Sequence, residues 1–337
     1  MKIAFFEADA REEKYFRENL KLSGKHKAVY FKGELNERNV EKVKDVDVLV
    51  VFIHSSVNKE ILKKMPKLKY ITTMSTGFDH IDIAECKYLG IKISNVPFYG
   101  ENTVAEHAFG LILTLSRKLY WAIERTKRDD FSLSGLEGFD LKGRTLGVIG
   151  PGHIGQHVIR MARGFEMKVL AYSPFVDKKL EKKLGFTYVS LNELLKKSDI
   201  ITLHAPLNGD TRHMINMSNI KLIKRDAFLI NTARGGLIET GALKYALDNG
   251  ILAGAALDVL EGEDTIAEEA QLLKNGKKIN EEEWKTFIRN HLLLKDKNVV
   301  VTPHNAFYSR EAVCRILDTT IDNISAFLKG KVKNRVK

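Results

Sequence analysis

Short apolar segments alternate with longer helical stretches along this sequence. In the first hundred residues the apolar segments are KIAFF, VDVLVVFI, KYITTM and KISNVP. The pattern starts again near Thr103 with a long apolar helical segment, TVAEHAFGLILTLSRKLYWAIERT, which precedes TLGVIG, KVLAYS, IITLHAP, AFLINTA, AGAALDV and NVVVTP. Strands that alternate with helices form parallel sheets covered by helices. The pattern therefore predicts an α/β protein with two doubly wound parallel sheets.

A break in this pattern marks the expected domain boundary. Proline and glycine interrupt it between Pro97 and Glu101, so one sheet is expected to end there and the next to begin. Between Asp264 and Asp296 a charged segment, AEEAQLLKNGKKINEEEWKTFIRN, predicts one or two surface helices. The chain closes with SREAVCRILDTTIDNISAFLKG, an amphipathic helix whose packing partner the pattern does not identify.

Length and composition describe an ordinary globular protein. The 337 residues suffice for two domains, and 44% of them are hydrophobic and 29% charged. No apolar run approaches the roughly 20 residues that span a bilayer, and acidic residues follow the first apolar segment too closely for a secretory signal. A cytoplasmic location is therefore expected. Cys86 and Cys314 lie far apart without a neighbouring cluster of histidines, so neither a disulfide nor a metal site is predicted.

The net charge of +11 raises the question of nucleic-acid binding. The lysines are scattered and interleaved with glutamate, as in EKVKDVD and KKLEKKLGF, which favours a solvated surface over a nucleic-acid interface. A basic surface also attracts small anionic substrates. We therefore expect a small anion as partner, and no nucleic acid or membrane.

A glycine-rich motif is the strongest local signal for a cofactor. GPGHIG places Gly150, Gly152 and Gly155 between the strand TLGVI and the helical run QHVIRMARGF, which is the context that a dinucleotide motif requires. The first glycine permits a tight turn, the second lets the backbone approach a pyrophosphate, and the third allows close packing of helix on strand. The helix N-terminus then attracts the phosphates. A turn that merely packs is the alternative, and the flanking elements favour the dinucleotide.

The position that would bind the adenosine ribose departs from the usual pattern. In NAD-binding folds the next strand, here MKVLAYS, ends in an acid that accepts hydrogen bonds from the ribose hydroxyls. Ser173 occupies this position, Asp177 follows beyond Pro174, and Lys178 and Lys179 come next. The sequence therefore leaves open whether the protein shows the usual preference for NAD over NADP.

Polar residues gather at the ends of the strands of the second sheet, where open α/β sheets bind ligands. In chain order they are His204 and Pro206, Thr232 and Arg234, Asp258 and Glu263, and His304. Taken singly, Arg234 is compatible with a surface arginine and His304 with a core histidine. Their convergence beside a dinucleotide motif favours catalysis.

These residue types suit the reduction of a 2-oxo acid. Hydride addition to the C2 carbon builds negative charge on its oxygen, which needs a proton donor near neutral pH. His304 is the expected donor, and a carboxylate at Glu263 would orient its imidazole and favour the charged form. The guanidinium of Arg234 would bind the substrate carboxylate and polarise the neighbouring carbonyl.

Several motifs together resemble the D-isomer-specific 2-hydroxyacid dehydrogenase family, and within it the D-lactate dehydrogenase branch. They are STGFDHIDI at residues 75–83, NVPFYGENTVAEHA at residues 95–108, GPGHIG, NTARGG, AALDVLEGE and TPHNAFYS. The resemblance implies a Rossmann cofactor domain over residues 100–304, inserted into a flavodoxin-like substrate domain of residues 1–99 and 305–337. It also implies that the final helix returns to the first domain, and that the chain forms a homodimer through the long helix after Thr103.

The resemblance assigns roles to individual residues. Arg234 matches the substrate-binding arginine, Glu263 the supporting acid and His304 the catalytic acid and base. The backbone of Thr76 and Gly77 matches the loop that receives the substrate carboxylate. The cofactor site is expected to be lined by Gly150, Gly152, His153, Ile154, Gly155, Ser173, Ala205, Pro206, Thr211, Thr232, Ala233 and Asp258.

The substrate is less closely defined. Tyr99, Phe307 and Tyr308 resemble the lactate and hydroxyisocaproate branch rather than the glyoxylate reductases, so pyruvate and D-lactate are the first choice. Broader reduction of branched or aromatic 2-oxo acids stays open, because one methylene in an apolar pocket discriminates by only about 1–3 kcal/mol. Two further alternatives are an NAD-sensing regulator of the same family and a relative that oxidises phosphite or formate.

Overall fold

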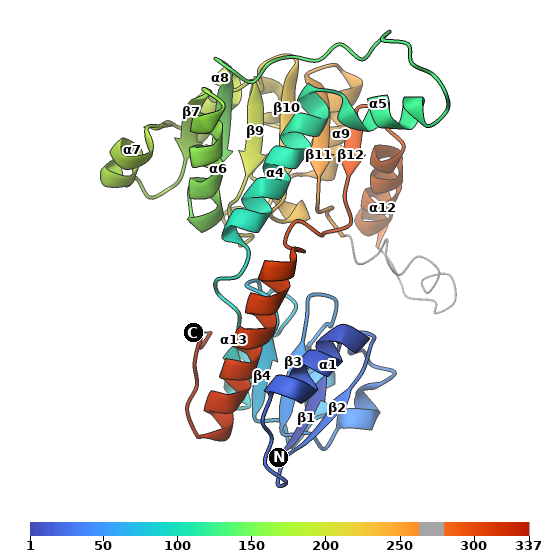
Figure 1. Ribbon diagram of the computed structural model, residues 1–337, viewed down its shortest axis with the longest axis vertical. Coiled ribbons are helices and arrows are strands. Elements are labelled where there is room, and N and C mark those ends of the chain that lie inside the picture. Colours follow the sequence, from blue (N-terminus) through green and yellow to red (C-terminus); the bar gives the residue numbers. More distant parts are fainter. Residues whose placement is uncertain (263–279, 337) are drawn as a thin grey trace. The chain divides into compact units, whose positions relative to one another are not determined.

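The computed structural model describes residues 1–262 and 280–336. The chain forms two compact units, Met1–Tyr99 with Ser309–Lys337, and Gly100–Tyr308. Each is an α/β unit built on a parallel sheet, which confirms the predicted fold class (Figure 1). Residues 305–308, which were expected in the first domain, group with the second unit instead.

The first unit holds a five-stranded sheet in the order β2-β1-β3-β4-β5, with all neighbours parallel. The strands are β1 (Lys2–Phe5), β2 (Lys27–Tyr30), β3 (Val48–Val51), β4 (Tyr70–Thr73) and β5 (Lys92–Ser94). This order is the flavodoxin-like one. The sequence pattern missed β2, because its residues alternate between exposed and half-buried at the edge of the sheet.

Helices cover this sheet. They are α1 (Ala10–Asn19), the 3-10 helix η1 (Val40–Val43), α2 (Lys59–Lys63), α3 (Ile83–Tyr88) and α13 (Arg310–Leu328). The final helix α13 packs on α1 and β4, where Phe327 stacks on Tyr70 with ring centroids 4.2 Å apart. Its buried Asn323 donates Nδ2 to the carbonyl of Asn95 at 2.9 Å. The C-terminal helix is therefore part of the first unit, as the resemblance implied.

The second unit holds a seven-stranded parallel sheet in the order β12-β11-β10-β9-β6-β7-β8. Its strands are β6 (Thr145–Ile149), β7 (Lys168–Tyr172), β8 (Thr187–Tyr188), β9 (Ile200–Leu203), β10 (Ala227–Asn231), β11 (Leu252–Leu257) and β12 (Val299–Val301). The chain order reverses between β6 and β9, as in a Rossmann fold, and ligands bind outside the carboxyl ends of the strands at such a point. The short edge strand β8 was not predicted.

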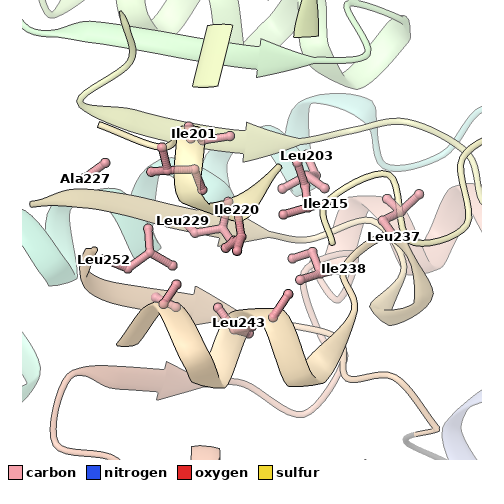
Figure 2. Close-up of a cluster of buried hydrophobic side chains, with 14 of the residues drawn as sticks. Ile201, Leu203, Ile215, Ile220, Ala227, Leu229, Leu237, Ile238, Leu243 and Leu252 are labelled. Atoms are coloured by element: carbon pink, nitrogen blue, oxygen red, sulfur yellow. The ribbon is translucent and has the colours of Figure 1, made fainter. Parts of the chain in front are cut away.

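Helices lie on both faces of this sheet. They are α4 (Glu101–Ser116), α5 (Leu119–Thr126), α6 (His153–Gly164), α7 (Lys178–Leu184), α8 (Leu191–Lys197), η2 (Ile220–Leu222), η3 (Gly235–Leu237), α9 (Thr240–Asp248) and α12 (Glu281–Leu294). Figure 2 shows one of the two resulting cores, in which Leu229 of β10 and Ile220 of η2 lie near Leu243 of α9. Each such side chain contributes roughly 1.5–3 kcal/mol when fully buried. In the described part of the chain no helix is both long and apolar enough to span a membrane.

The long helix expected after Thr103 is broken in two. Lys118 adopts a left-handed conformation with φ 53°, between the end of α4 and the start of α5. The carbonyl of Ser116, which would continue the helix, instead accepts the N–H of Phe139 at 2.8 Å. A side chain at the neighbouring Gly138 would lie 2.2 Å from that carbonyl oxygen, so glycine permits the contact. A contact with Phe139, 23 residues further along the chain, therefore ends α4, and a periodicity argument does not detect it.

Candidate active site

The turn after β6 is shaped by glycines. Gly150 has φ +89°, and a Cβ added there would lie 2.8 Å from the backbone nitrogen of Ala205, at the end of β9. A Cβ at Gly155 would lie 2.3 Å from the carbonyl oxygen of Gly150. Real Cβ atoms do not approach backbone so closely, so both positions require glycine. The predicted tight turn and the close helix packing are thus both present.

The N-terminus of α6 is open. Gly152 precedes the helix with no side-chain cap, and a Cβ added at Gly152 would meet nothing within 4 Å. His153 is exposed, with its Nδ1 3.7 Å from Oε1 of Glu101 on α4, and Ile154 is half-buried. Uncapped backbone N–H groups at a helix N-terminus attract phosphate oxygens. This end of α6 therefore fits the pyrophosphate of a dinucleotide.

Two buried polar atoms at adjacent strand ends have no protein partner in the described structure. They are Nδ1 of His204, which follows β9, and Oγ1 of Thr232, which follows β10. A buried polar atom without a partner costs about 1–3 kcal/mol, so native proteins supply one. Nε2 of His204 lies 2.9 Å from Oγ1 of Thr202, and burial lowers the pKa of His204 to about 3. The neutral imidazole of His204 and the hydroxyl of Thr232 can therefore each form a hydrogen bond with a ligand, which agrees with a cofactor bound at these strand ends.

The ribose position after β7 uses a serine whose oxygen already accepts a bond. Oγ of Ser173 accepts the N–H of Phe175 at 3.1 Å, which leaves the hydroxyl proton to be donated. Asp177 does not replace the missing acid, because its carboxylate caps α7 and accepts the N–H of Lys179 at 2.9 Å. Nζ of Lys178 is bound to Glu181 at 2.8 Å.

The loop after β9 is closed by its own side chains. Oγ1 of Thr211 donates to the carbonyl of Pro206 at 2.6 Å, and Asn208 donates its N–H to the same Oγ1 at 2.8 Å. Ala205, at the start of this loop, is buried. Thr211 therefore shapes the loop, and its predicted contact with the cofactor stays a prediction.

The turn that carries Arg234 is fixed from both sides. Asn231 donates Nδ2 to the carbonyl of Arg234 at 2.9 Å and accepts the N–H of Ala233 at 3.0 Å. A Cβ at the next residue, Gly235, would lie 2.1 Å from the carbonyl carbon of Leu260, so this turn lies directly against the turn after β11. The half-buried guanidinium of Arg234 donates Nη1 to the carbonyl of Ala233 at 2.8 Å.

A buried aspartate organises the loop that carries His304. The carboxylate of Asp258 accepts the N–H of Asn305 at 3.1 Å, the N–H of Ala306 at 2.8 Å and the hydroxyl of Thr302. The carbonyl of Asp258 accepts the N–H of His304 at 2.9 Å. His304 itself is left-handed, with φ 51°. Asp258 was expected to line the cofactor site, and its visible role is to hold this loop.

Sequence reasoning missed several residues that build these turns. Glu261 accepts a bond from Nε2 of His213 at 2.5 Å and from Oγ1 of Thr240 at 2.8 Å, and its carbonyl accepts Nδ2 of the buried Asn290 at 2.8 Å. Asn290 lies on α12, within the charged segment that was read only as surface helix. Glu263 lies outside the described residues, so its predicted pairing with His304 stays a prediction. The two acids are close in sequence, and the pattern gave no reason to single out Glu261.

The remaining predicted substrate residues divide between the units. In the first unit Thr76 donates its hydroxyl to the carbonyl of Val96 at 2.8 Å. Among the described residues, the backbone N–H groups of Thr76 and Gly77 have no acceptor, which agrees with a loop that binds a carboxylate. The carbonyl of Tyr99 accepts Nε of Arg315 at 2.6 Å. In the second unit the rings of Phe307 and Tyr308 pack edge to face, 5.7 Å apart.

The chain resembles known proteins over most of its length. Residues 109–306 match the sequence model of the NAD binding domain of D-isomer specific 2-hydroxyacid dehydrogenases. The chain is 33% identical to the D-lactate dehydrogenase of Escherichia coli (strain K12), over 98% of this chain and 98% of that protein. It is 40% identical to an aromatic 2-oxoacid reductase of Clostridium sporogenes (strain ATCC 15579), over 87% of this chain and 86% of the relative. The crystal structure of a D-lactate dehydrogenase from Aquifex aeolicus, complexed with NAD and lactic acid, superposes with a TM-score of 0.86 at 37% identity, covering 97% of this chain and 96% of that one.

Proposed function

Because the chain belongs to the D-isomer-specific 2-hydroxyacid dehydrogenases, we propose that it reduces pyruvate and related 2-oxo acids to the D-2-hydroxy acids. The matching domain is an NAD binding domain, and NAD is the cofactor. When bound, the reduced cofactor supplies the hydride that adds to C2 of the substrate. The protein must hold the substrate carboxylate and deliver a proton to the C2 oxygen.

The observation that carries the proposal is the grouping of polar residues at one edge of the second sheet. Buried Nδ1 of His204 and Oγ1 of Thr232 have no partner among residues 1–262 and 280–336, and they follow adjacent parallel strands next to the open end of α6. Arg234 and His304 follow β10 and β12 at the same edge. A cofactor site next to a carboxylate-binding cation and a proton donor is what reduction of a 2-oxo acid requires.

His304 and Arg234 have separate tasks in this proposal. The imidazolium of His304 gives its proton to the C2 oxygen as the hydride arrives, which prevents a full alkoxide charge from forming. The guanidinium of Arg234 binds the substrate carboxylate with two parallel N–H groups, and its charge also stabilises the developing oxyanion. In the reverse direction, His304 accepts the hydroxyl proton.

A broader substrate range is the second candidate. Tyr308 is 58% exposed and follows Phe307, so two aromatic rings lie close to His304 in sequence. The similarity to an aromatic 2-oxoacid reductase also supports substrates with larger side chains. An apolar pocket distinguishes such substrates by only about 1–3 kcal/mol per methylene.

A substrate panel tests the proposal. The purified chain would be given pyruvate, 2-oxoisocaproate, phenylpyruvate and glyoxylate, with NADH and with NADPH, and the handedness of each product determined by chiral chromatography. Reduction of pyruvate to D-lactate supports the first choice, and a higher kcat/KM for phenylpyruvate supports the second candidate. No turnover with any 2-oxo acid would favour the NAD-sensing regulator, and oxidation of phosphite or formate would replace the proposal.

The ribose site bears on cofactor choice. A serine at position 173 cannot repel the 2′-phosphate of NADP as a carboxylate would, and its free hydroxyl proton can bond a ribose or a phosphate oxygen. Lys178 is paired with Glu181, so it is not a dedicated cation for that phosphate. We therefore propose that NAD is preferred and that NADP is accepted within about two powers of ten in kcat/KM, a difference of up to about 3 kcal/mol.

We also propose that the chain forms a homodimer. Apolar side chains of α5 are exposed, with 44% of Leu119, 51% of Tyr120 and 55% of Ile123 accessible. Exposed apolar clusters often mark interfaces, and the family resemblance supports pairing of subunits through the long helical segment after Thr103. Light scattering of the full chain should give twice the mass of one chain, and Ile123→Asp should shift it towards one. A monomeric wild-type protein would overturn this assignment.

A further inference from the structure

His107 on α4 contacts the network beneath His304, although no role has been assigned to it. Its Nε2 lies 3.2 Å from Oγ1 of Thr302 and 3.5 Å from Oδ1 of Asp258. We propose that His107 is a positioning residue for the reduction: through Thr302 and Asp258 it fixes the loop that carries His304. The inference rests on the proposed function for its catalytic consequence, and its structural part can be tested without turnover.

The direction of the hydrogen bonds follows from counting protons. The hydroxyl of Thr302 has one proton, and it is donated to Oδ1 of Asp258. Oγ1 of Thr302 can then only accept from Nε2 of His107, so Nε2 must carry a hydrogen. This fixes the tautomer of the neutral ring as the Nε2–H form. The chain of bonds runs from His107 through Thr302 to Asp258.

The loop depends on this chain because the N–H groups of three successive residues, His304, Asn305 and Ala306, donate to Asp258. Pro303 has no N–H, and His304 is left-handed, a conformation that non-glycine residues rarely adopt. The N–H groups of Asn305 and Ala306 both donate to the Asp258 carboxylate. The orientation of that carboxylate therefore determines where the backbone that follows His304 lies.

Both ends of the network sit on rigid elements. Asp258 is 1% exposed at the end of β11, and α4 packs against β10 and β11. The His107 side chain is 24% exposed, so it reaches from the helix to the buried carboxylate with one edge in solvent. Without His107, Oγ1 of Thr302 loses its donor, and its hydroxyl can rotate away from Asp258. Among the described contacts, the carboxylate then keeps the N–H groups of Asn305 and Ala306, which belong to the loop itself.

The test compares variants that differ in one hydrogen bond. His107→Ala removes the donor, and His107→Gln keeps an N–H near the position of Nε2 without a titratable ring. Thr302→Val breaks the chain one step further on. His157→Ala, at a half-buried histidine of α6 in the same unit, is the matched control. Each is measured for kcat, for KM with NADH and 2-oxo acid, for melting temperature, and for amide hydrogen exchange of the segment that contains Asn305 and Ala306.

We expect His107→Ala to lower kcat by roughly 10- to 100-fold, the scale of a small misplacement of a catalytic group, with KM for NADH changed less than about threefold. His107→Gln should recover most of the loss, and His157→Ala should match the wild type. The double variant His107→Ala with Thr302→Val should be no slower than the slower single variant, because both break the same chain. The Asn305 and Ala306 amides should exchange faster in His107→Ala and in Thr302→Val, and at the wild-type rate in His157→Ala.

The exchange measurement separates this inference from the proposed function. If the wild type reduces no 2-oxo acid, the proposed function fails, and faster exchange of Asn305 and Ala306 in His107→Ala still supports the positioning contact. If exchange in His107→Ala equals that of the wild type, the positioning role is overturned whatever the activity. The positioning role would also be overturned if the loss of kcat in His107→Ala only accompanied a lower melting temperature and His107→Gln did not restore kcat.

Discussion

The turn after β6 and the loop after β12 lie at the same edge of one sheet, yet they are built by different means. The β6 turn is shaped by backbone alone: Gly150 and Gly155 allow contacts that any side chain would block. The β12 loop is shaped by distant side chains, since Asp258 and Thr302 hold the backbone around His304. The first arrangement is local in sequence, and the second joins α4, β11 and β12.

The difference separates two kinds of functional residue. The turn after β6 binds its ligand with backbone N–H groups, which nearly all residues have, so residue identity is critical at its glycines. A proton donor needs one particular side chain in one place, and the protein supplies a buried network to hold it. Changes in the turn should therefore impair cofactor binding and folding, whereas changes in the loop should impair the chemical step.

Replacing His304 should have the largest effect on rate. We expect His304→Ala to lower kcat by roughly 10²–10⁴, because the alkoxide would form without a positioned acid. Binding of NADH, followed by its fluorescence, should be nearly unchanged. A variant that keeps most of its activity would remove this histidine from the mechanism.

Replacing Gly150 should impair cofactor binding and folding rather than the chemical step. Gly150→Ala forces a Cβ against the backbone of Ala205 at a φ of +89°, so we expect a loss of about 1–3 kcal/mol in the free energy of unfolding and at least a tenfold rise in KM for NADH. Urea unfolding and steady-state kinetics measure the two effects.

Gly164→Ala is the control for that substitution. Gly164 ends α6, and a Cβ added there meets nothing within 4 Å. The change should leave KM for NADH unaltered and stabilise the helix slightly. If Gly150→Ala and Gly164→Ala had equal effects, the turn after β6 would not require glycine at position 150.

Arg234 tests whether geometry or charge matters in the turn after β10. Arg234→Lys keeps the charge and loses the planar fork, so KM for pyruvate should rise and kcat should fall together. We expect kcat/KM to drop roughly 10- to 100-fold, or about 1.4–2.8 kcal/mol. A variant that changes only in thermal stability would assign Arg234 a structural role.

The smallest expected effect concerns Ser173. Ser173→Asp should widen the preference for NAD over NADP by about tenfold, or 1.4 kcal/mol, chiefly by weakening NADP through repulsion of its 2′-phosphate. The ratio of kcat/KM for the two cofactors, in wild type and variant, measures it. A wild-type preference for NAD above roughly a thousandfold, about 4 kcal/mol, would show that another residue discriminates.

The sequence predicted what local pattern determines. Fully buried strands such as β9 and β10 stand out as apolar runs, and the GPGHIG turn is recognisable because its constraints fall within six residues. The edge strands β2 and β8 are short and partly exposed, so they lack that signal. The end of α4 depends on Phe139, which belongs to another part of the chain.

The candidate site shows the same division. Arg234 and His304 could be named because each follows a predicted strand at the ligand-binding edge. His107 and Asn290 could not, because their partners Asp258 and Glu261 are distant in sequence and meet them only in the fold. A histidine in a helix and an asparagine in a charged segment carry no local mark of such contacts.

Stereospecific reduction of pyruvate by the full chain with NADH, measured beside His304→Ala, tests the central claim most directly. We expect D-lactate as the product and a loss of roughly 10²–10⁴ in kcat for the variant, with NADH still bound. L-lactate as the product, or equal rates for wild type and variant, would contradict it.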